Sequence, residues 1–120
     1  MKISIITKQQ DLLKRPLAGD ILKDADGTIN IQIQELNNDD YEFLLAIHCL
    51  IENKLIEKRK IKITDIEDFE KSYYSNSKIS GSQDDPGDEP DSPYHKEHIF
   101  ATYIEMLIAK ELNLSWKSCR

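Results

Sequence analysis

Alternating and β-branched positions near the N-terminus predict a small sheet. Residues 2–7 are rich in β-branched side chains and predict the first strand. Residues 28–34 alternate polar and apolar side chains, as a strand does when one of its faces packs on a core. An Asp-Gly pair separates this strand from the apolar residues 21–23 and is typical of a tight hairpin turn. Residues 1–36 are therefore predicted to form a small antiparallel β-sheet or hairpin.

The pattern then changes from a period of two to a helical period. Residues 37–76 predict two helices. In the first, over residues 40–58, apolar side chains recur at i, i+3 and i+4, which indicates one face on a core. The second begins with the capping-box sequence TDIE at 64–67, in which a Thr and a Glu three residues later satisfy backbone groups at a helix start.

A long acidic segment separates these helices from a last one. Residues 77–92 are dominated by Gly, Pro, Ser and Asp, which predicts a long loop. Ser-Pro at 92–93 predicts the start of the last helix, over residues 93–113. Its stretch 99–109 has one charged residue, Glu105, so this helix is expected to be buried on several sides. We therefore predict a single α+β domain, with an N-terminal sheet followed by three helices.

Composition narrows the functional classes. The 120 residues are 39% hydrophobic and 32% charged, which suits one charged domain. No segment approaches the roughly 18 uncharged apolar residues of a membrane span. The net charge of −6 argues against a nucleic-acid partner, because phosphates are bound by a basic face. Two cysteines and the lack of a signal-peptide pattern predict free thiols and a cytoplasmic location.

Candidate chemistry begins with a His/Glu pair on the first predicted helix. His48 and Glu52 are four residues apart and therefore share a helix face that is otherwise apolar. A charge in apolar surroundings is costly unless it is paired or bound to a metal. This spacing lets both side chains reach one ion, as in helical zinc motifs. Taken alone, such a pair is usually a hydrogen-bonded element of the core.

The last helix repeats this feature with His98 and Glu105, two turns apart on an otherwise apolar stripe. Two such helices can form a metal site in a bundle core or a hydrogen-bonded polar cluster. We predict His48, Glu52 and His98 as ligands, and Glu105 as a fourth ligand or as the acceptor that orients a histidine. Zinc suits this donor set, and manganese or iron is also permitted. If the site is hydrolytic, Glu97 or Glu105 would be the base.

Two motif blocks together resemble a family of small uncharacterised bacterial and phage proteins. Members have a tyrosine-led helix with a His-Glu-Leu-x-Glu-Ala motif, a Pro-Gly-Asp connector and a Pro-Tyr-x-x-Glu-His segment. The matching residues here are Tyr41, His48 and Glu52, then Pro86-Gly87-Asp88, Pro93-Tyr94, Glu97-His98, Ala101 and Ile104-Glu105. The resemblance spans most of the chain and implies a zincin-like motif, but the family carries no established activity.

The motif is degenerate in this chain. In the metalloprotease helix, two histidines bind zinc and an intervening glutamate is the base. Glu52 stands where that helix has its second histidine, and Cys49 stands where it has the glutamate. A thiol is a poor base for activating water, so peptidase activity by that mechanism is not expected.

Two functional hypotheses follow. The first is a metal-binding protein with a zincin-like site between two helices; any enzyme of this kind would be a metal-dependent hydrolase. The second is a non-enzymatic accessory module of a phage or mobile element, which binds a protein partner or a small ligand and uses its His/Glu cluster structurally. The acidic loop suits a basic protein partner, because opposite charges steer association. A monomer or a homodimer is expected, without nucleic acid or membrane.

Overall fold

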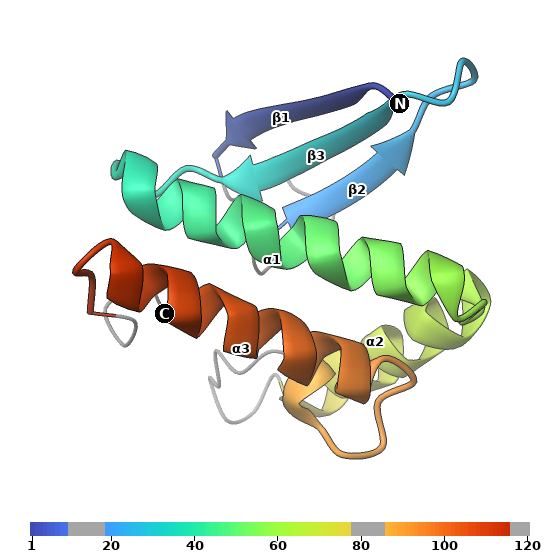
Figure 1. Cartoon of the computed structure of the whole chain (residues 1–120). Coiled ribbons are helices and arrows are strands. Elements are labelled where there is room, and N and C mark those ends of the chain that lie inside the picture. Colours follow the sequence, from blue (N-terminus) through green and yellow to red (C-terminus); the bar gives the residue numbers. More distant parts are fainter. Residues whose placement is uncertain (10–18, 78–85, 116–120) are drawn as a thin grey trace.

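The computed structural model describes residues 1–9, 19–77 and 86–115. Its elements follow the predicted order of a small N-terminal sheet and then helices (Figure 1). They are β1 (Ile3–Lys8), β2 (Gly19–Lys23), β3 (Ile29–Gln34), α1 (Asp39–Lys58), α2 (Ile63–Ser77), the short 3-10 turn η2 (Pro86–Asp88) and α3 (His95–Glu111). The α+β prediction is confirmed. Residues 78–85 of the predicted acidic loop, and Cys119, lie outside the described residues.

The sheet has the strand order β1-β3-β2. β2 and β3 form the predicted antiparallel hairpin, with Ile21 opposite Ile31, and Gly27 in its turn has a φ of 89° that favours glycine. β1 instead pairs in parallel with β3, with Ile5 opposite Ile31. β1 lies beside β3, the second strand of the hairpin, and both strands run in the same direction. The sheet is therefore mixed rather than purely antiparallel.

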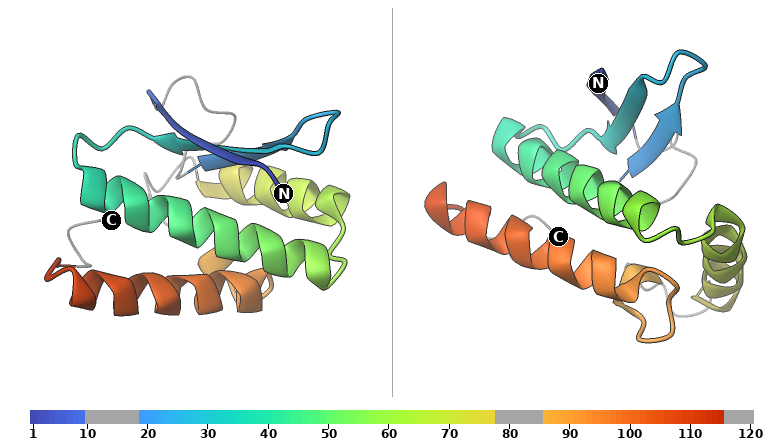
Figure 2. Two further views of the ribbon diagram at one scale, coloured as in Figure 1. Left: turned by 45° about the horizontal axis from the view of Figure 1, so that its top comes forward. Right: turned by 45° about the vertical axis from the view of Figure 1, so that its right-hand side comes forward.

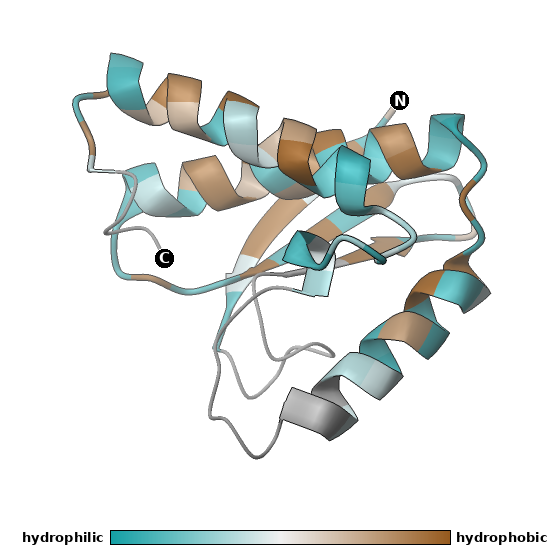
Figure 3. Cartoon of the chain, turned by 90° about the horizontal axis from the view of Figure 1, so that it is seen from below, coloured by the Kyte–Doolittle hydropathy of each residue, from teal (hydrophilic) through white to brown (hydrophobic). Residues whose placement is uncertain are grey.

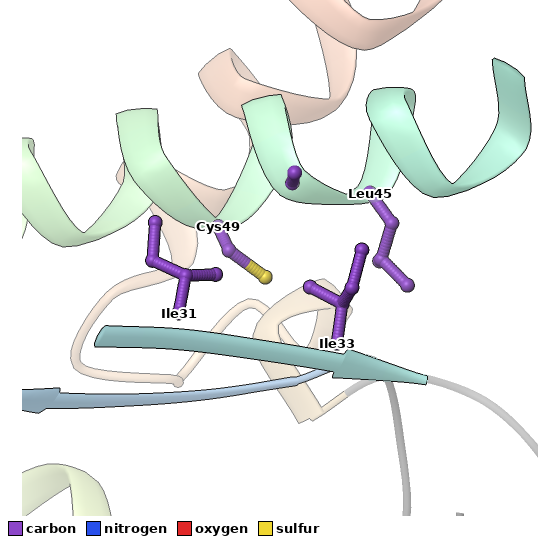
Figure 4. Close-up of a cluster of buried hydrophobic side chains, with 5 residues drawn as sticks. Ile31, Ile33, Leu45 and Cys49 are labelled. Atoms are coloured by element: carbon purple, nitrogen blue, oxygen red, sulfur yellow. The ribbon is translucent and has the colours of Figure 1, made fainter. Parts of the chain in front are cut away.

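The apolar core lies between β3 and α1. Ile31 and Ile33 are buried on one face of β3, while the alternate residues of the strand are partly exposed, which confirms the predicted alternation. Their side chains meet Leu45, Ala46 and Cys49 of α1 (Figure 4). Burying each isoleucine contributes roughly 1.5–3 kcal/mol. This contact fixes α1 along the sheet and turns its opposite face toward the rest of the molecule.

The helices form a second and third layer. α1 lies between the sheet and α3, which runs antiparallel to α1, and α2 crosses at the end where α1 finishes (Figure 2). The N-terminus of α1 is capped by Asn38, whose side-chain oxygen accepts hydrogen bonds from the backbone N–H groups of Asp40 and Tyr41 at 3.0 and 3.1 Å. None of the described helices is long and apolar enough to cross a membrane.

The last helix differs from its prediction in two respects. It begins at His95 rather than at Pro93, because Tyr94 is non-helical and buried, with its hydroxyl donating to Glu70 of α2 at 3.0 Å. Ser92 accepts from the backbone N–H of Tyr94 in the preceding turn. The prediction that this helix is buried on several sides is also wrong, because five large apolar side chains on its outer face are exposed: Ile99, Phe100, Tyr103, Met106 and Leu107.

Candidate metal centre

The antiparallel packing of α1 and α3 brings two histidines and a glutamate together. His48 and Glu52 come from α1, and His98 comes from the first turns of α3. Glu52 Oε2 lies 3.0 Å from His48 Nε2 and 2.8 Å from His98 Nδ1, and the two nitrogens are 3.2 Å apart. Both histidines are buried, and the glutamate side chain is 12% exposed. Among the described residues, these three form the group that could hold a metal ion.

The far nitrogen of each imidazole contacts another carboxylate. His48 Nδ1 lies 3.0 Å from Oε1 of Glu105, which is buried on α3. His98 Nε2 lies 2.9 Å from Oδ1 of Asp88, whose side chain is 56% exposed on η2. A carboxylate on the outer nitrogen is the common support of a metal-bound histidine, because it fixes the ring orientation and the tautomer.

These carboxylates determine which nitrogens carry protons. An ionised carboxylate only accepts hydrogen bonds, so with Glu105 and Asp88 ionised His48 Nδ1 would donate to Glu105 and His98 Nε2 would donate to Asp88. In neutral imidazoles, the two inner nitrogens then present lone pairs toward each other and toward the Glu52 carboxylate. Three acceptors within 3.2 Å of one another repel unless positive charge lies between them. A metal ion, or protons on the two rings, could supply that charge.

Glu52 is ionised in these surroundings. Its burial acts to raise the pKa of the carboxyl group. Hydrogen bonds from His48 and His98, together with the charges of the two rings, outweigh that effect and lower the pKa to about 2. The group therefore presents an anionic oxygen to whatever cation occupies the space between the rings.

The η2 turn is fitted closely against His98. A Cβ atom on Gly87 would lie 2.5 Å from Cγ and 2.8 Å from Nδ1 of the His98 ring, so the ring occupies the space of any side chain at this position. His95 Nδ1 lies 2.9 Å from the carbonyl oxygen of Gly87, to which a protonated Nδ1 donates. The turn thereby holds Asp88 against His98.

Sequence reasoning missed this part of the centre. Asp88 was one of several acids in a predicted loop, and nothing in its spacing relates it to His98. The sequence feature that points to Asp88 is the Pro-Gly-Asp connector shared with the resembled family. A glycine that such a motif requires often marks a close approach of the backbone to another group, here the His98 ring.

The structure separates the predicted glutamates into different positions. Glu52 lies between the histidines, and Glu105 lies behind His48, which is the second of the two positions predicted for it. Glu97 is buried and forms an ion pair with Arg59, at 2.5 Å between Oε2 and Nη1. The roles of these residues as ligands or as a base stay predictions.

Fold and site together define a small α+β protein with a buried His/Glu/His centre between two antiparallel helices. Comparison with family models, with curated proteins and with solved structures gives no match.

Proposed function

We propose that the protein binds one divalent transition metal ion through His48 Nε2, His98 Nδ1 and Glu52 Oε2. The observation that carries the proposal is the convergence of three acceptor atoms, 2.8–3.2 Å apart, in a buried position. The support of both imidazoles by carboxylates adds to it, because such pairs are typical of metal-bound histidines.

Zinc is the ion we propose first. Zinc–nitrogen bonds are about 2.0–2.1 Å long, so tetrahedral donors lie about 3.4 Å apart. The donor atoms here are slightly closer, at 2.8–3.2 Å, and an ion requires only small outward movements of the three side chains. Iron or manganese also accepts two imidazoles and one carboxylate, so the identity of the metal has to be measured.

The charges of the site favour an ion with two positive charges. Glu52 and Glu105 are buried beside the histidines, and buried anions are costly without a positive partner. A divalent ion balances both, while Asp88 is partly hydrated at the surface.

We propose metal binding without peptidase activity. Three protein ligands leave a position open for water, as in catalytic zinc sites. A peptidase also needs a base near that water. Glu97 is paired with Arg59 and Glu105 with His48, so both carboxylates have other partners. A reaction at the open position, if found, would be a metal-dependent hydrolysis.

The proposal is tested by loading metal-free protein with zinc and measuring metal content and affinity. Wild-type protein should bind about one equivalent, and the His48→Ala/His98→Ala variant should bind none. Glu57→Ala/Lys110→Ala is the matched control, because these two residues are exposed on α1 and α3, outside the centre. Equal zinc binding by the double variant and the wild type would contradict the proposal.

The alternative is that the cluster is structural and the protein is a non-enzymatic binding module. One feature of the contacts favours this alternative. If both imidazoles are protonated, His48 Nε2 and His98 Nδ1 would each donate a hydrogen bond to the Glu52 carboxylate, and the cluster would need no metal ion. If the cluster is structural, a chelator should leave the melting temperature unchanged. The His48→Ala/His98→Ala variant should then be less stable than the wild type but have the same metal content.

A further inference from the structure

The imidazole ring of His98 needs more than its two nitrogen contacts to be aimed at a metal ion. Glu52 and Asp88 contact Nδ1 and Nε2 of this ring at 2.8 and 2.9 Å. These contacts fix the ring in its own plane but allow it to tilt, because a hydrogen bond weakens steeply only below about 120°. A tilt turns the lone pair of Nδ1 away from an ion between the two histidines. Packing against the ring therefore has to set its orientation.

Tyr94 supplies packing of this kind. Its ring and that of His98 are nearly perpendicular, at 83°, with centroids 6.4 Å apart, which is an edge-to-face contact typical of aromatic pairs. The carbonyl oxygen of Tyr94 also accepts a hydrogen bond from the backbone N–H of His98 at 2.9 Å. Tyr94 is only 2% exposed, so its ring is enclosed by protein. Tyr94 thus contacts both the backbone and the ring of His98.

The orientation of Tyr94 depends in turn on α2. The hydroxyl of Tyr94 donates to Oε1 of Glu70 at 3.0 Å. Glu70 is buried and lies one turn after Ile66, which is buried on the same face of α2. Because Tyr94 precedes α3 and has a non-helical backbone, with φ −118° and ψ 26°, helix geometry alone does not set its side chain. In Figure 3, α2 lies to one side of the pair formed by α1 and α3, and this hydrogen bond joins it to them.

We propose that Tyr94 is a positioning residue of the candidate centre, held by Glu70 so that its ring orients His98. The inference rests on the proposed metal binding and adds a role for α2, which supplies none of the three donor atoms. The contacts run from Glu70 through Tyr94 to the ring of His98, whose Nδ1 is the proposed ligand atom. A misaimed ring lowers metal affinity in a protein that is still folded, because the groups around a ligand act by orienting it.

The first test separates zinc affinity from stability. Tyr94→Phe keeps the ring but removes the hydroxyl, and Glu70→Leu removes the acceptor. In competition with a chelator, each should weaken zinc binding about three- to tenfold, which is less than the loss of a direct partner of a ligand. The double variant should bind zinc no more weakly than the single variants, because both changes remove the same contact. Glu70→Gln keeps an acceptor oxygen and should restore most of the affinity lost in Glu70→Leu.

Matched controls make the same chemical changes at exposed positions. They are Tyr103→Phe on α3 and Glu67→Leu on α2, and both should bind zinc as the wild type does. Circular dichroism checks that every variant is folded.

Cobalt(II) in place of zinc reports the orientation of the ligands, since its visible absorption bands depend on coordination geometry. Tyr94→Phe and Glu70→Leu should shift these bands or change their intensity, and Glu70→Gln should return the spectrum toward that of the wild type. Wild-type zinc affinity and an unchanged cobalt spectrum in both Tyr94→Phe and Glu70→Leu would overturn positioning by Tyr94 and leave metal binding intact. A wild-type protein that binds no zinc would instead overturn the metal site, and this inference with it.

Discussion

Glu52 is the residue on which both buried histidines converge. Its carboxylate is within hydrogen-bond distance of a nitrogen from each ring, and its pKa is lowered to about 2 although burial acts in the opposite direction. A carboxyl group that ionises more readily in the folded chain than in the unfolded chain stabilises the fold at neutral pH. This property belongs to the metal-free protein and can be measured without any metal.

We expect the free energy of unfolding of the metal-free protein to depend on pH through Glu52. The ordinary pKa of 4.5 applies in the unfolded chain and about 2 in the folded one, so the contribution is complete above 4.5 and is lost as the pH falls toward 2. Glu52→Gln should lower stability at pH 7 by on the order of 1–3 kcal/mol and reduce the fall below pH 4.5. Urea unfolding across this pH range measures both effects.

Glu57→Gln is the control for this experiment, because Glu57 is an exposed glutamate on the same helix. It should leave the pH dependence unchanged. An identical acid response in Glu52→Gln and wild-type protein would show that Glu52 is not held in its anionic form by the histidines.

Asp88 is a test of the support given to His98. Its carboxylate fixes the ring nitrogen that faces away from Glu52, and partners of metal-bound histidines typically contribute 10–100-fold to affinity. We expect Asp88→Asn to weaken zinc binding by about that factor with little loss of stability, because the side chain is 56% exposed. Competition with a fluorescent chelator measures the affinity. Asp91→Asn, in the same acidic segment, should bind zinc as the wild type does.

At the scale of elements, local sequence patterns predicted most of the fold. The alternation over β3, the Asp-Gly turn and the apolar spacing of α1 each depend on neighbouring residues, and each is confirmed. β1 pairs in parallel because its neighbour is β3 and not β2. The local sequence pattern does not encode which strands become neighbours. The late start of α3 depends on the contact of Tyr94 with Glu70, two residues far apart in the sequence.

The same distinction applies to the candidate centre. The i, i+4 pair His48 and Glu52, and the repeated His/Glu pattern on α3, identified the side chains that the packing brings together. Asp88 and Gly87 could not be identified by spacing, because their relation to His98 arises from the path of the chain before α3. The apolarity of the last helix predicts burial on several sides, whereas five of its large apolar side chains are exposed.

The ion pair between α1 and α3 gives a prediction at this scale. Arg59 follows the last residue of α1, and Glu97 lies in the first turn of α3, so their contact joins the two helix ends. Because Glu97 is buried, we expect Glu97→Gln to lower the free energy of unfolding by roughly 1–3 kcal/mol. Zinc stoichiometry should stay at one equivalent. Loss of zinc with unchanged stability would instead place Glu97 in the centre.

At the scale of the molecule, the two interfaces of α1 differ in chemistry. Toward the sheet, α1 packs Leu45 and Cys49 against two buried isoleucines. Toward α3, the buried residues of the facing helix include His98 and Glu105 beside two alanines, which contribute little apolar area. The sheet side is therefore held by the hydrophobic effect, while the α3 side depends strongly on satisfying its polar groups.

Metal binding should accordingly stabilise the α3 side more than the sheet side. Zinc at a hundred times its dissociation constant adds about 2.7 kcal/mol to global stability, which raises the melting temperature by on the order of 10 °C in a domain of this size. Sub-global opening of α3 breaks the centre, whereas fluctuations confined to the sheet leave it intact. We expect hydrogen exchange of amides over residues 98–109 to slow on addition of zinc under conditions where opening is local, with a smaller change over residues 29–34. Uniform slowing in both segments would show that the sheet and α3 open only together, and no slowing in either would mean that zinc does not join α1 to α3.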